Sequence, residues 1–185
     1  MGDHKQTSNK NYNINKQVIR VAGTIPECVV NAPGGISYVI FAQGCNHKCP
    51  GCYNPETHDF HGGEDRYIFD IIEDIQNYPL SRIVTFTGGD PFYQPDSFYI
   101  LARELRKLNY KLVGYSGFYF VELLQDSKCR DLLAQLDILI DGPFVLEQKD
   151  RELNFRGSRN QRILDVKESM AEQRPVSITK YYERS

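Results

Sequence analysis

Residues 37–57 read SYVIFAQGCNHKCPGCYNPET, and the rest of the chain is organised around them. The first part, residues 37–43, is short, apolar and rich in β-forming side chains, which is typical of a strand buried on both faces. Gly44 follows this run, and Cys45, Cys49 and Cys52 come directly after it. The stretch therefore predicts a buried strand with a cysteine loop at its carboxyl end.

The pattern of a strand followed by an amphipathic helix repeats beyond this stretch. Strand-like apolar runs occupy residues 82–87, 111–115 and 137–141, and an earlier strand pair is predicted at Val18–Val21 and Cys28–Val30. The segments between the later runs place apolar residues at the i, i+3, i+4, i+7 spacing of one helical face. These positions are Ile68, Ile71, Ile72 and Ile75; Phe98, Leu101, Ala102 and Leu105; and Cys129, Leu132, Leu133 and Leu136.

Strands that alternate with helices predict an α/β fold with a parallel sheet and right-handed crossovers. A complete barrel of eight strand–helix units takes roughly 250 residues, whereas this chain has 185. We therefore expect a partial (β/α) barrel of about five or six parallel strands, by proportion from that size.

The length of the chain suits one core better than two, so we expect residues 18–185 to form a single domain. Residues 1–17 are polar and carry few apolar side chains, which predicts a flexible N-terminal arm. From Leu146 onward the periodicity weakens, and we expect loop or irregular cover there.

Charge and composition disfavour several classes of partner. The net charge is −2 and the chain has no basic run of five or more residues, so neither nucleic acid nor an anionic membrane is expected to bind. The N-terminal residues resemble neither a signal peptide nor a membrane span. The sequence thus predicts a cytoplasmic protein, in which thiols stay reduced.

The cysteines are distributed unevenly, unlike a disulfide framework. Three of the five have the spacing C-x3-C-x2-C, and Cys28 and Cys129 stand apart. Three thiolates on one loop can hold three irons of a [4Fe-4S] cluster, for which four cysteines are the usual complement. The fourth iron then keeps an open position, and an open position on a metal lets a small molecule coordinate.

Two other metal sites could use the same loop. A structural zinc site would combine the three cysteines with His47, His58 or His61, although zinc ligands usually come as two separated pairs. A ferredoxin-type carrier would need a fourth cysteine nearby. Cys129 lies on an apolar helix face, and we expect both it and Cys28 in the core.

Glycine-rich and polar segments follow the later strands. They are residues 87–91 (TGGDP), 115–117 (YSG) and 141–144 (DGPF). Paired glycines let the backbone approach a ligand closely, and α/β sheets bind ligands at the carboxyl ends of their strands. The candidate binding residues are Gly88, Gly89, Asp90, Tyr115, Ser116 and Asp141. The alternative for each is a turn that flanks a buried strand.

The cysteine spacing just after a strand resembles the signature of the radical S-adenosylmethionine superfamily. Residues 44–57 (GCNHKCPGCYNPET) resemble the loop of one branch, the activating proteins of anaerobic ribonucleoside-triphosphate reductase. The TGGD turn resembles the GGE motif of the superfamily, with Asp90 in place of Glu. Residues 155–162 (FRGSRNQR) resemble a C-terminal element of the branch. The resemblance extends from about Val21 to Val166.

The resemblance implies a [4Fe-4S] cluster on the three cysteines, with its open iron chelated by the amino and carboxylate groups of S-adenosyl-L-methionine. The superfamily usually has an aromatic residue before the last cysteine, to pack on the adenine, where this chain has Gly51. Tyr53 follows that cysteine instead. The resemblance implies that Gly88, Gly89 and Asp90 bind the methionine amino group. Tyr53 is a further candidate for cofactor binding, and Tyr115, Ser116 and Asp141 are candidates for the nucleoside because they lie at the strand ends.

The three arginines of residues 155–162 have two possible interpretations. An arginine cluster is usually a solvated surface. A guanidinium fork also binds carboxylates through two hydrogen bonds, so the segment is a candidate for the methionine carboxylate or for the surface of a partner.

The implied activity is reductive cleavage of S-adenosylmethionine by an electron from a flavodoxin-type reductant. The resulting 5′-deoxyadenosyl radical would abstract a Cα hydrogen from a glycine in the large subunit of anaerobic ribonucleoside-triphosphate reductase, with no acid–base residue required. One alternative is a radical enzyme that acts on another glycyl-radical enzyme or on a small molecule. The other is a zinc-binding interaction module without enzymatic activity.

Overall fold

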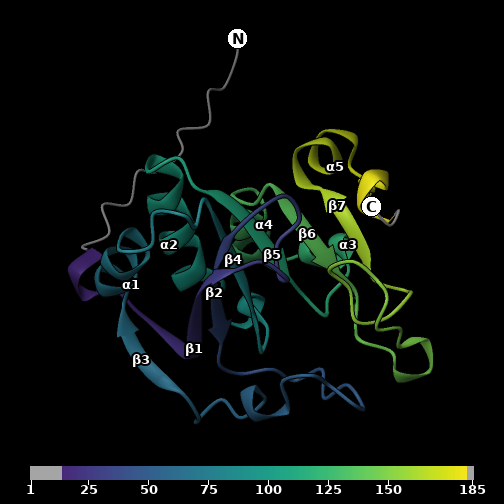
Figure 1. The fold of residues 1–185 in the computed structure, drawn as a ribbon, viewed down its shortest axis with the longest axis horizontal. Coiled ribbons are helices and arrows are strands. Elements are labelled where there is room, and N and C mark those ends of the chain that lie inside the picture. Colours follow the sequence, from purple (N-terminus) through teal and green to yellow (C-terminus); the bar gives the residue numbers. More distant parts are fainter. Residues whose placement is uncertain (1–13, 183–185) are drawn as a thin grey trace.

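The computed structural model describes residues 14–182 and contains one seven-stranded sheet with its helices (Figure 1). The strands are β1 (Val18–Cys28), β2 (Ser37–Ala42), β3 (Glu64–Tyr67), β4 (Ile83–Gly88), β5 (Lys111–Tyr115), β6 (Ile138–Asp141) and β7 (Arg162–Asp165). The helices are α1 (Ile68–Gln76), α2 (Pro95–Lys107), α3 (Phe120–Leu123), α4 (Ser127–Leu133) and α5 (Val166–Glu172). Single 3-10 turns lie at Ile14–Lys16, Pro55–Thr57, Pro91–Tyr93, Leu146–Gln148 and Thr179–Tyr181. The predicted α/β class is confirmed.

The strands are arranged in the order β3-β1-β2-β4-β5-β6-β7. The four inner strands β2, β4, β5 and β6 run parallel to one another, and they match the apolar runs predicted at residues 37–43, 82–87, 111–115 and 137–141. By contrast, β1, β3 and β7 pair antiparallel with their neighbours. The sheet is therefore mixed, and the expectation of a purely parallel sheet is wrong. The closure of the sheet into a partial barrel stays a prediction.

Connection length explains why the outer strands reverse. Only residues 29–36 join β1 to β2, and parallel strands need a crossover of a dozen or more residues. The chain between β6 and β7 is longer but contains no α-helix to carry it across the sheet. β7 therefore returns along β6 in the opposite direction.

β1 is one strand where the sequence predicted two. Its first residues, Val18–Val21, pair with β3, and its later residues pair with β2. Register shifts interrupt the pairing with β2 at two places along the strand, and such irregularities bend a strand. Val29 and Val30, predicted as strand, lie in the bend that follows Cys28.

The segment after Leu146 also differs from its prediction. A loop covers residues 149–161, as expected, but β7 and α5 follow it. The sequence signal for β7 is weak because this four-residue strand is specified by its pairing with β6, which is distant in sequence.

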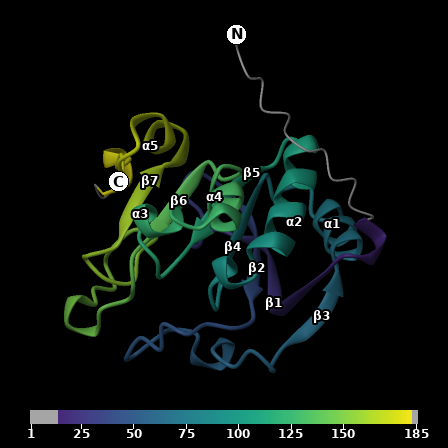
Figure 2. The same cartoon turned by 180° about the vertical axis from the view of Figure 1, so that it is seen from behind.

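Two apolar clusters cover the two faces of the sheet. Helices α1, α2 and α4 lie on one face (Figure 2), and their predicted apolar positions are buried there, with Cys129 packed at the edge. Side chains of β4 point to both faces of the sheet, since Phe86 belongs to this cluster and Ile83 to the second. The second cluster contains Ala32, Ile83, Val113, Ile138, Ile140 and Ile163, with Phe155, Ile178 and Tyr181 packed against it. The sheet is thus buried on both faces, as the continuous apolar runs predicted.

Residues 1–13, most of the predicted arm, lie outside the described residues. Ile14 begins the described part and packs against the cluster under the helices. Within residues 14–182, no helix combines the length and the apolar character needed to cross a membrane.

Candidate functional site

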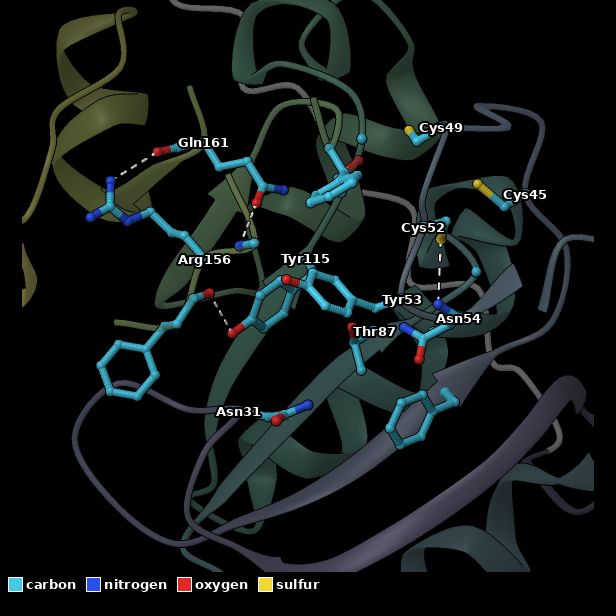
Figure 3. A pocket seen from close by; sticks show the side chains of 18 of the residues that line it. Asn31, Cys45, Cys49, Cys52, Tyr53, Asn54, Thr87, Tyr115, Arg156 and Gln161 are labelled. Atoms are coloured by element: carbon cyan, nitrogen blue, oxygen red, sulfur yellow. Dashed lines mark hydrogen bonds between the residues drawn. The ribbon is translucent and has the colours of Figure 1, made fainter. Parts of the chain in front are cut away.

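A cavity of about 630 Å³ lies at the carboxyl ends of the parallel strands (Figure 3). Its walls come from the cysteine loop after β2, the ends of β4 and β5, the turn after β6 and residues 150–161. Ligands bind at this edge in α/β sheets, and the volume lies within the usual range of ligand pockets. The predicted site residues that line the cavity are Cys45, Cys49, Cys52, Tyr53, Gly88, Gly89, Tyr115 and Ser116.

The cysteine loop follows a tight path that backbone hydrogen bonds fix at both ends. The N–H of Gly44, just after β2, donates to the carbonyl of Thr57 at 2.8 Å and closes the loop. Within the loop, the N–H of Cys52 donates to the carbonyl of Cys49 at 3.1 Å. These bonds gather three thiols from one short segment into one wall of the cavity.

Gly51 explains one departure from the superfamily pattern. Its φ is +73°, in the left-handed region that favours glycine, and a Cβ there would lie 2.8 Å from Cδ1 of Leu146. The loop therefore favours glycine at this position. The aromatic residue beside the last cysteine is Tyr53, which is 53% exposed and packs edge-to-face on Phe144 with ring centroids 5.3 Å apart.

Burial disfavours the thiolate form of Cys45 and Cys52. It raises the pKa of Cys45 to about 11, against the opposing effect of a backbone hydrogen bond. Burial also raises the pKa of Cys52, and the N–H of Asn54, which donates to its Sγ at 3.4 Å, partly counteracts that effect. A thiol ligates metal as the thiolate, so binding of iron here releases protons.

The donor set fits an iron–sulfur cluster better than a zinc ion. Within residues 14–182, no three His, Cys, Asp or Glu side chains come together as the ligands of a single ion. His47, one candidate fourth ligand for zinc, has its Nε2 3.0 Å from Oδ2 of Asp90. Three thiols that line one wall of a roomy cavity are the ligands that a cubane with one open iron requires.

Asp90 lies beneath the cavity and does not line it. Its side chain is 1% exposed, and each carboxylate oxygen accepts hydrogen bonds from the protein. Oδ1 accepts the N–H of Phe92 at 2.9 Å, while Oδ2 accepts the Ser116 hydroxyl and the Gly117 N–H at 2.9 Å each. With His47 as a further neighbour, this carboxylate joins the cysteine loop to the ends of β4 and β5.

Gly88 and Gly89 bring the end of β4 against the start of the cysteine loop. The N–H of Gly89 donates to the carbonyl of Ala42 at 2.8 Å. A Cβ on Gly89 would lie 2.6 Å from the carbonyl oxygen of Gly44, and one on Gly88 would lie 2.7 Å from Cα of Phe41. Only glycine permits this approach of two backbones.

At the end of β5, Tyr115 and Ser116 line the cavity, but both have partners in the protein. The Tyr115 hydroxyl donates to the carbonyl of Phe155 at 2.9 Å, and burial raises the pKa of this tyrosine. The Ser116 hydroxyl donates to Asp90. Tyr115 therefore holds the segment after residue 150 over the strand ends.

Asp141, at the end of β6, is 0% exposed and lies outside the cavity wall. Its carboxylate accepts Nε and Nη2 of Arg162 at 2.9 and 2.5 Å, and the N–H of Phe120 at 2.7 Å. This fork of hydrogen bonds ties β6 to β7 and to α3. Arg162 is one of the three arginines that the sequence singled out.

Two parts of the cavity wall were missed by the sequence analysis. Cys28, predicted to be core, is partly buried and lines the cavity with its neighbour Asn31. The other missed part is residues 150–154, which adjoin the candidate segment 155–162; Figure 3 shows Arg156 and Gln161 of that segment across the pocket from the cysteines. Gln161 stabilises the turn at residues 157–161, because its Oε1 accepts the N–H groups of Gly157 and Ser158 at 2.8 and 3.2 Å.

Comparison with known families supports the nature of this site. A family described as a 4Fe-4S single cluster domain matches residues 30–164, which include the whole cysteine loop. The fold and the loop of three thiols thus define an α/β iron–sulfur protein with one cluster.

Curated relatives match nearly their whole length. The anaerobic ribonucleoside-triphosphate reductase-activating protein of Pasteurella multocida is 32% identical over 145 residues, 74% of this chain and 90% of the relative. The protein of that name from Haemophilus influenzae is 35% identical over 144 residues, 74% of this chain and 91% of its own. This chain belongs to the family of anaerobic ribonucleoside-triphosphate reductase-activating proteins. Among solved structures, QueE from Escherichia coli aligns over 54% of this chain and 52% of its own, with a TM-score of 0.43 and 16% identity.

Proposed function

We propose that this protein binds a [4Fe-4S] cluster through Cys45, Cys49 and Cys52, binds S-adenosyl-L-methionine beside it, and generates a glycyl radical on the large subunit of an anaerobic ribonucleoside-triphosphate reductase. One observation carries the proposal. The three thiols line the same cavity as the backbone at Gly88 and Gly89. A cluster with an open iron and a ligand held at the strand ends would therefore meet in one space.

A cluster held by Cys45, Cys49 and Cys52 would supply the one electron needed for reductive cleavage of the C5′–S bond of S-adenosylmethionine, and the products would be methionine and a 5′-deoxyadenosyl radical able to abstract the glycine hydrogen. The chemistry is that of the cofactors, and the protein contributes binding, orientation and exclusion of side reactions. No side chain of this chain has to transfer a proton.

The residues of the cavity have separate roles in the proposal. The bare backbone at Gly88 and Gly89 lies open to the methionine end of the ligand, next to the thiols. Tyr53 presents an exposed ring at the mouth, on which an adenine can stack, and Lys149 Nζ lies 4.8 Å from the centroid of that ring. Tyr115 and Ser116 form the floor at the end of β5.

Asp90 and Asp141 take positioning roles here in place of the direct cofactor contacts first expected. Each carboxylate is buried and already accepts several hydrogen bonds from the protein. A contact with the nucleoside or with the methionine amino group would have to replace one of those bonds, at a cost. Their effect is therefore to hold the strand ends and the cysteine loop in register.

Three further parts of the proposal rest on the sequence. A flavodoxin-type protein is the electron donor, the cytoplasm is the location, and residues 18–185 form one domain whose sheet curves as a partial barrel. The reducing conditions of the cytoplasm suit a loop of three free thiols.

The test is an electron paramagnetic resonance spectrum of the reconstituted, reduced protein mixed anaerobically with S-adenosylmethionine and the reductase large subunit. Cys52→Ala serves as the blank. We expect a glycyl doublet in the unmutated sample alone. If 5′-deoxyadenosine forms without a doublet, the radical chemistry holds and the partner is wrong. If neither product forms in a sample that retains its iron, the proposed activity is wrong.

A further inference from the structure

The three arginines of the FRGSRNQR segment have different surroundings. Arg159 forms an ion pair with Asp150 at 3.2 Å, and Arg162 forms one with the buried Asp141. Arg156 lines the cavity, and in residues 14–182 no carboxylate forms an ion pair with it. Arg156 is therefore the arginine of the motif that lines the cavity and has no ion pair among the described residues.

The contacts of Arg156 leave part of its binding capacity unused. Its Nη1 donates to the carbonyl of Gln161 at 3.3 Å, and the guanidinium carbon lies 4.0 Å from the ring centroid of Tyr182. Its Nε is buried and has no hydrogen-bond acceptor. Burial lowers the pKa of Arg156, and the effects of Tyr182 and Asp150 only partly offset this. A cation desolvated in this way gains most from an anion that supplies the missing charge and acceptors.

The charges around Arg156 favour the same kind of ligand. Arg151 also lines the cavity, is exposed and has no ion pair among the described residues. The single carboxylate in the described cavity wall is Asp150, which is engaged by Arg159. This side of the cavity therefore has an excess of positive charge.

Arg156 lies far enough across the cavity from the three cysteines that a ligand bound at Arg156 is separate from one bound at the thiols. Figure 3 shows Arg156 across the pocket from the three cysteines, with Tyr53 and Tyr115 between. An anion at Arg156 is thus a different group from one that coordinates at the thiols. Ile25, Val30 and Tyr53 line the same cavity with 47%, 68% and 53% of their surfaces exposed. Apolar side chains that share a cavity with an arginine suit a peptide segment with an acidic group.

We propose that Arg156, assisted by Arg151, forms a carboxylate subsite for the incoming protein substrate. The carboxylate is an Asp or Glu side chain, or a chain terminus, on the segment that carries the target glycine. It sets how far that segment enters the cavity, because the fork of Arg156 fixes the carboxylate in one orientation. The inference rests on the proposed function, and it adds the recognition element for the substrate.

The test compares the unmutated protein with Arg156→Gln, Arg156→Lys and Arg174→Gln. Arg174 is exposed and forms an ion pair with Glu172, so Arg174→Gln is the matched control for loss of one arginine. All variants carry the reconstituted cluster, and iron content and thermal unfolding are measured first. Binding of the reductase large subunit is then titrated calorimetrically with S-adenosylmethionine present. Binding of S-adenosylmethionine is measured separately by equilibrium dialysis without the partner.

We expect Arg156→Gln to weaken binding of the large subunit about ten- to a hundredfold, the range for one charge-assisted contact. Arg156→Lys should recover part of the loss, and Arg174→Gln should bind as the unmutated protein does. Affinity for S-adenosylmethionine should change less than twofold in all of them. A loss of S-adenosylmethionine affinity in Arg156→Gln would assign the anion to that cofactor and overturn the inference. Unchanged partner binding in a folded, iron-loaded Arg156→Gln would also overturn it.

The two proposals fail in different ways. If the unmutated protein neither binds the reductase subunit nor forms a glycyl radical on it, the proposed function fails. If the unmutated protein does both and Arg156→Gln matches it, the carboxylate subsite alone fails.

Discussion

The imidazole Nε2 of His47 lies 3.0 Å from Oδ2 of Asp90, and this contact joins the middle of the cysteine loop to the turn after β4. The same oxygen accepts hydrogen bonds from Ser116 and Gly117 at the end of β5. The His47 ring also packs edge-on against Phe118, with centroids 4.5 Å apart. A single buried carboxylate thus connects three segments that build the cavity.

Asp90→Asn should lower the free energy of unfolding of the cluster-free protein by about 2–4 kcal/mol, as expected when a buried charged network is broken. The amide keeps the size of the carboxylate but presents an N–H₂ group to donors. Anaerobic urea denaturation measures the change. Asp131→Asn, at an exposed position of α4, is the control and should change stability by less than about 0.5 kcal/mol. Equal stabilities of the two variants would contradict the role given to Asp90.

His47→Ala should reduce iron incorporation, because the cysteine loop loses both its hydrogen bond to Asp90 and its packing on Phe118. His47→Gln should restore much of it, since a glutamine amide can still donate to the carboxylate. Iron per chain and the spectrum of the reduced cluster measure both effects. His58→Ala should retain its iron, and a loss of metal in that variant would instead favour the zinc site with a histidine ligand.

Alanine at Cys45, Cys49 or Cys52 should reduce the iron content from about four atoms per chain to below one and abolish the brown colour. Cys129→Ala is the matched control among the thiols. Its Sγ donates to the carbonyl of Phe92 at 3.6 Å, and burial raises its pKa to about 12, so it is an inert core thiol. Loss of iron in Cys129→Ala without unfolding would show that the assignment of ligands is wrong.

Gly89→Ala should destabilise the protein by about 1–3 kcal/mol, the usual cost of overpacking. The new Cβ would lie 2.6 Å from the carbonyl oxygen of Gly44, a backbone atom that can move only if the cysteine loop moves. Gly35→Ala places its Cβ 3.3 Å from Cδ1 of Ile83, a flexible side-chain end, and should cost less. Urea denaturation compares the two, and iron content reports whether the loop has shifted in Gly89→Ala.

The sequence was sufficient to predict the parallel centre of the fold because its signals are local. The apolar runs of β2, β4, β5 and β6 and the spacing of Ile68, Ile71, Ile72 and Ile75 are each contained in one short segment. The outer strands depend on long-range pairing instead. β3 reads EDRY, with no apolar alternation, and forms because it can pair with the first part of β1.

The features of the site also differ in whether local sequence or distant segments determine them. Cysteine spacing and the order of strands placed the thiols, Gly88, Gly89 and Tyr115 at one sheet edge, and these residues do line one cavity. The orientation of a side chain within that edge was beyond the sequence, as Asp90 and Asp141 illustrate. Each turns inward because donors from distant segments, such as Gly117 and Arg162, surround it there.

The exposed ring of Tyr53 marks a cavity that opens to solvent beside the thiols. Any iron held on that loop is within reach of dissolved dioxygen, which oxidises exposed clusters and thiolates. Under the proposed function, a docked protein substrate would cover the same opening. Air exposure should inactivate the free protein faster than its complex, so one opening governs both access for the substrate and survival in air.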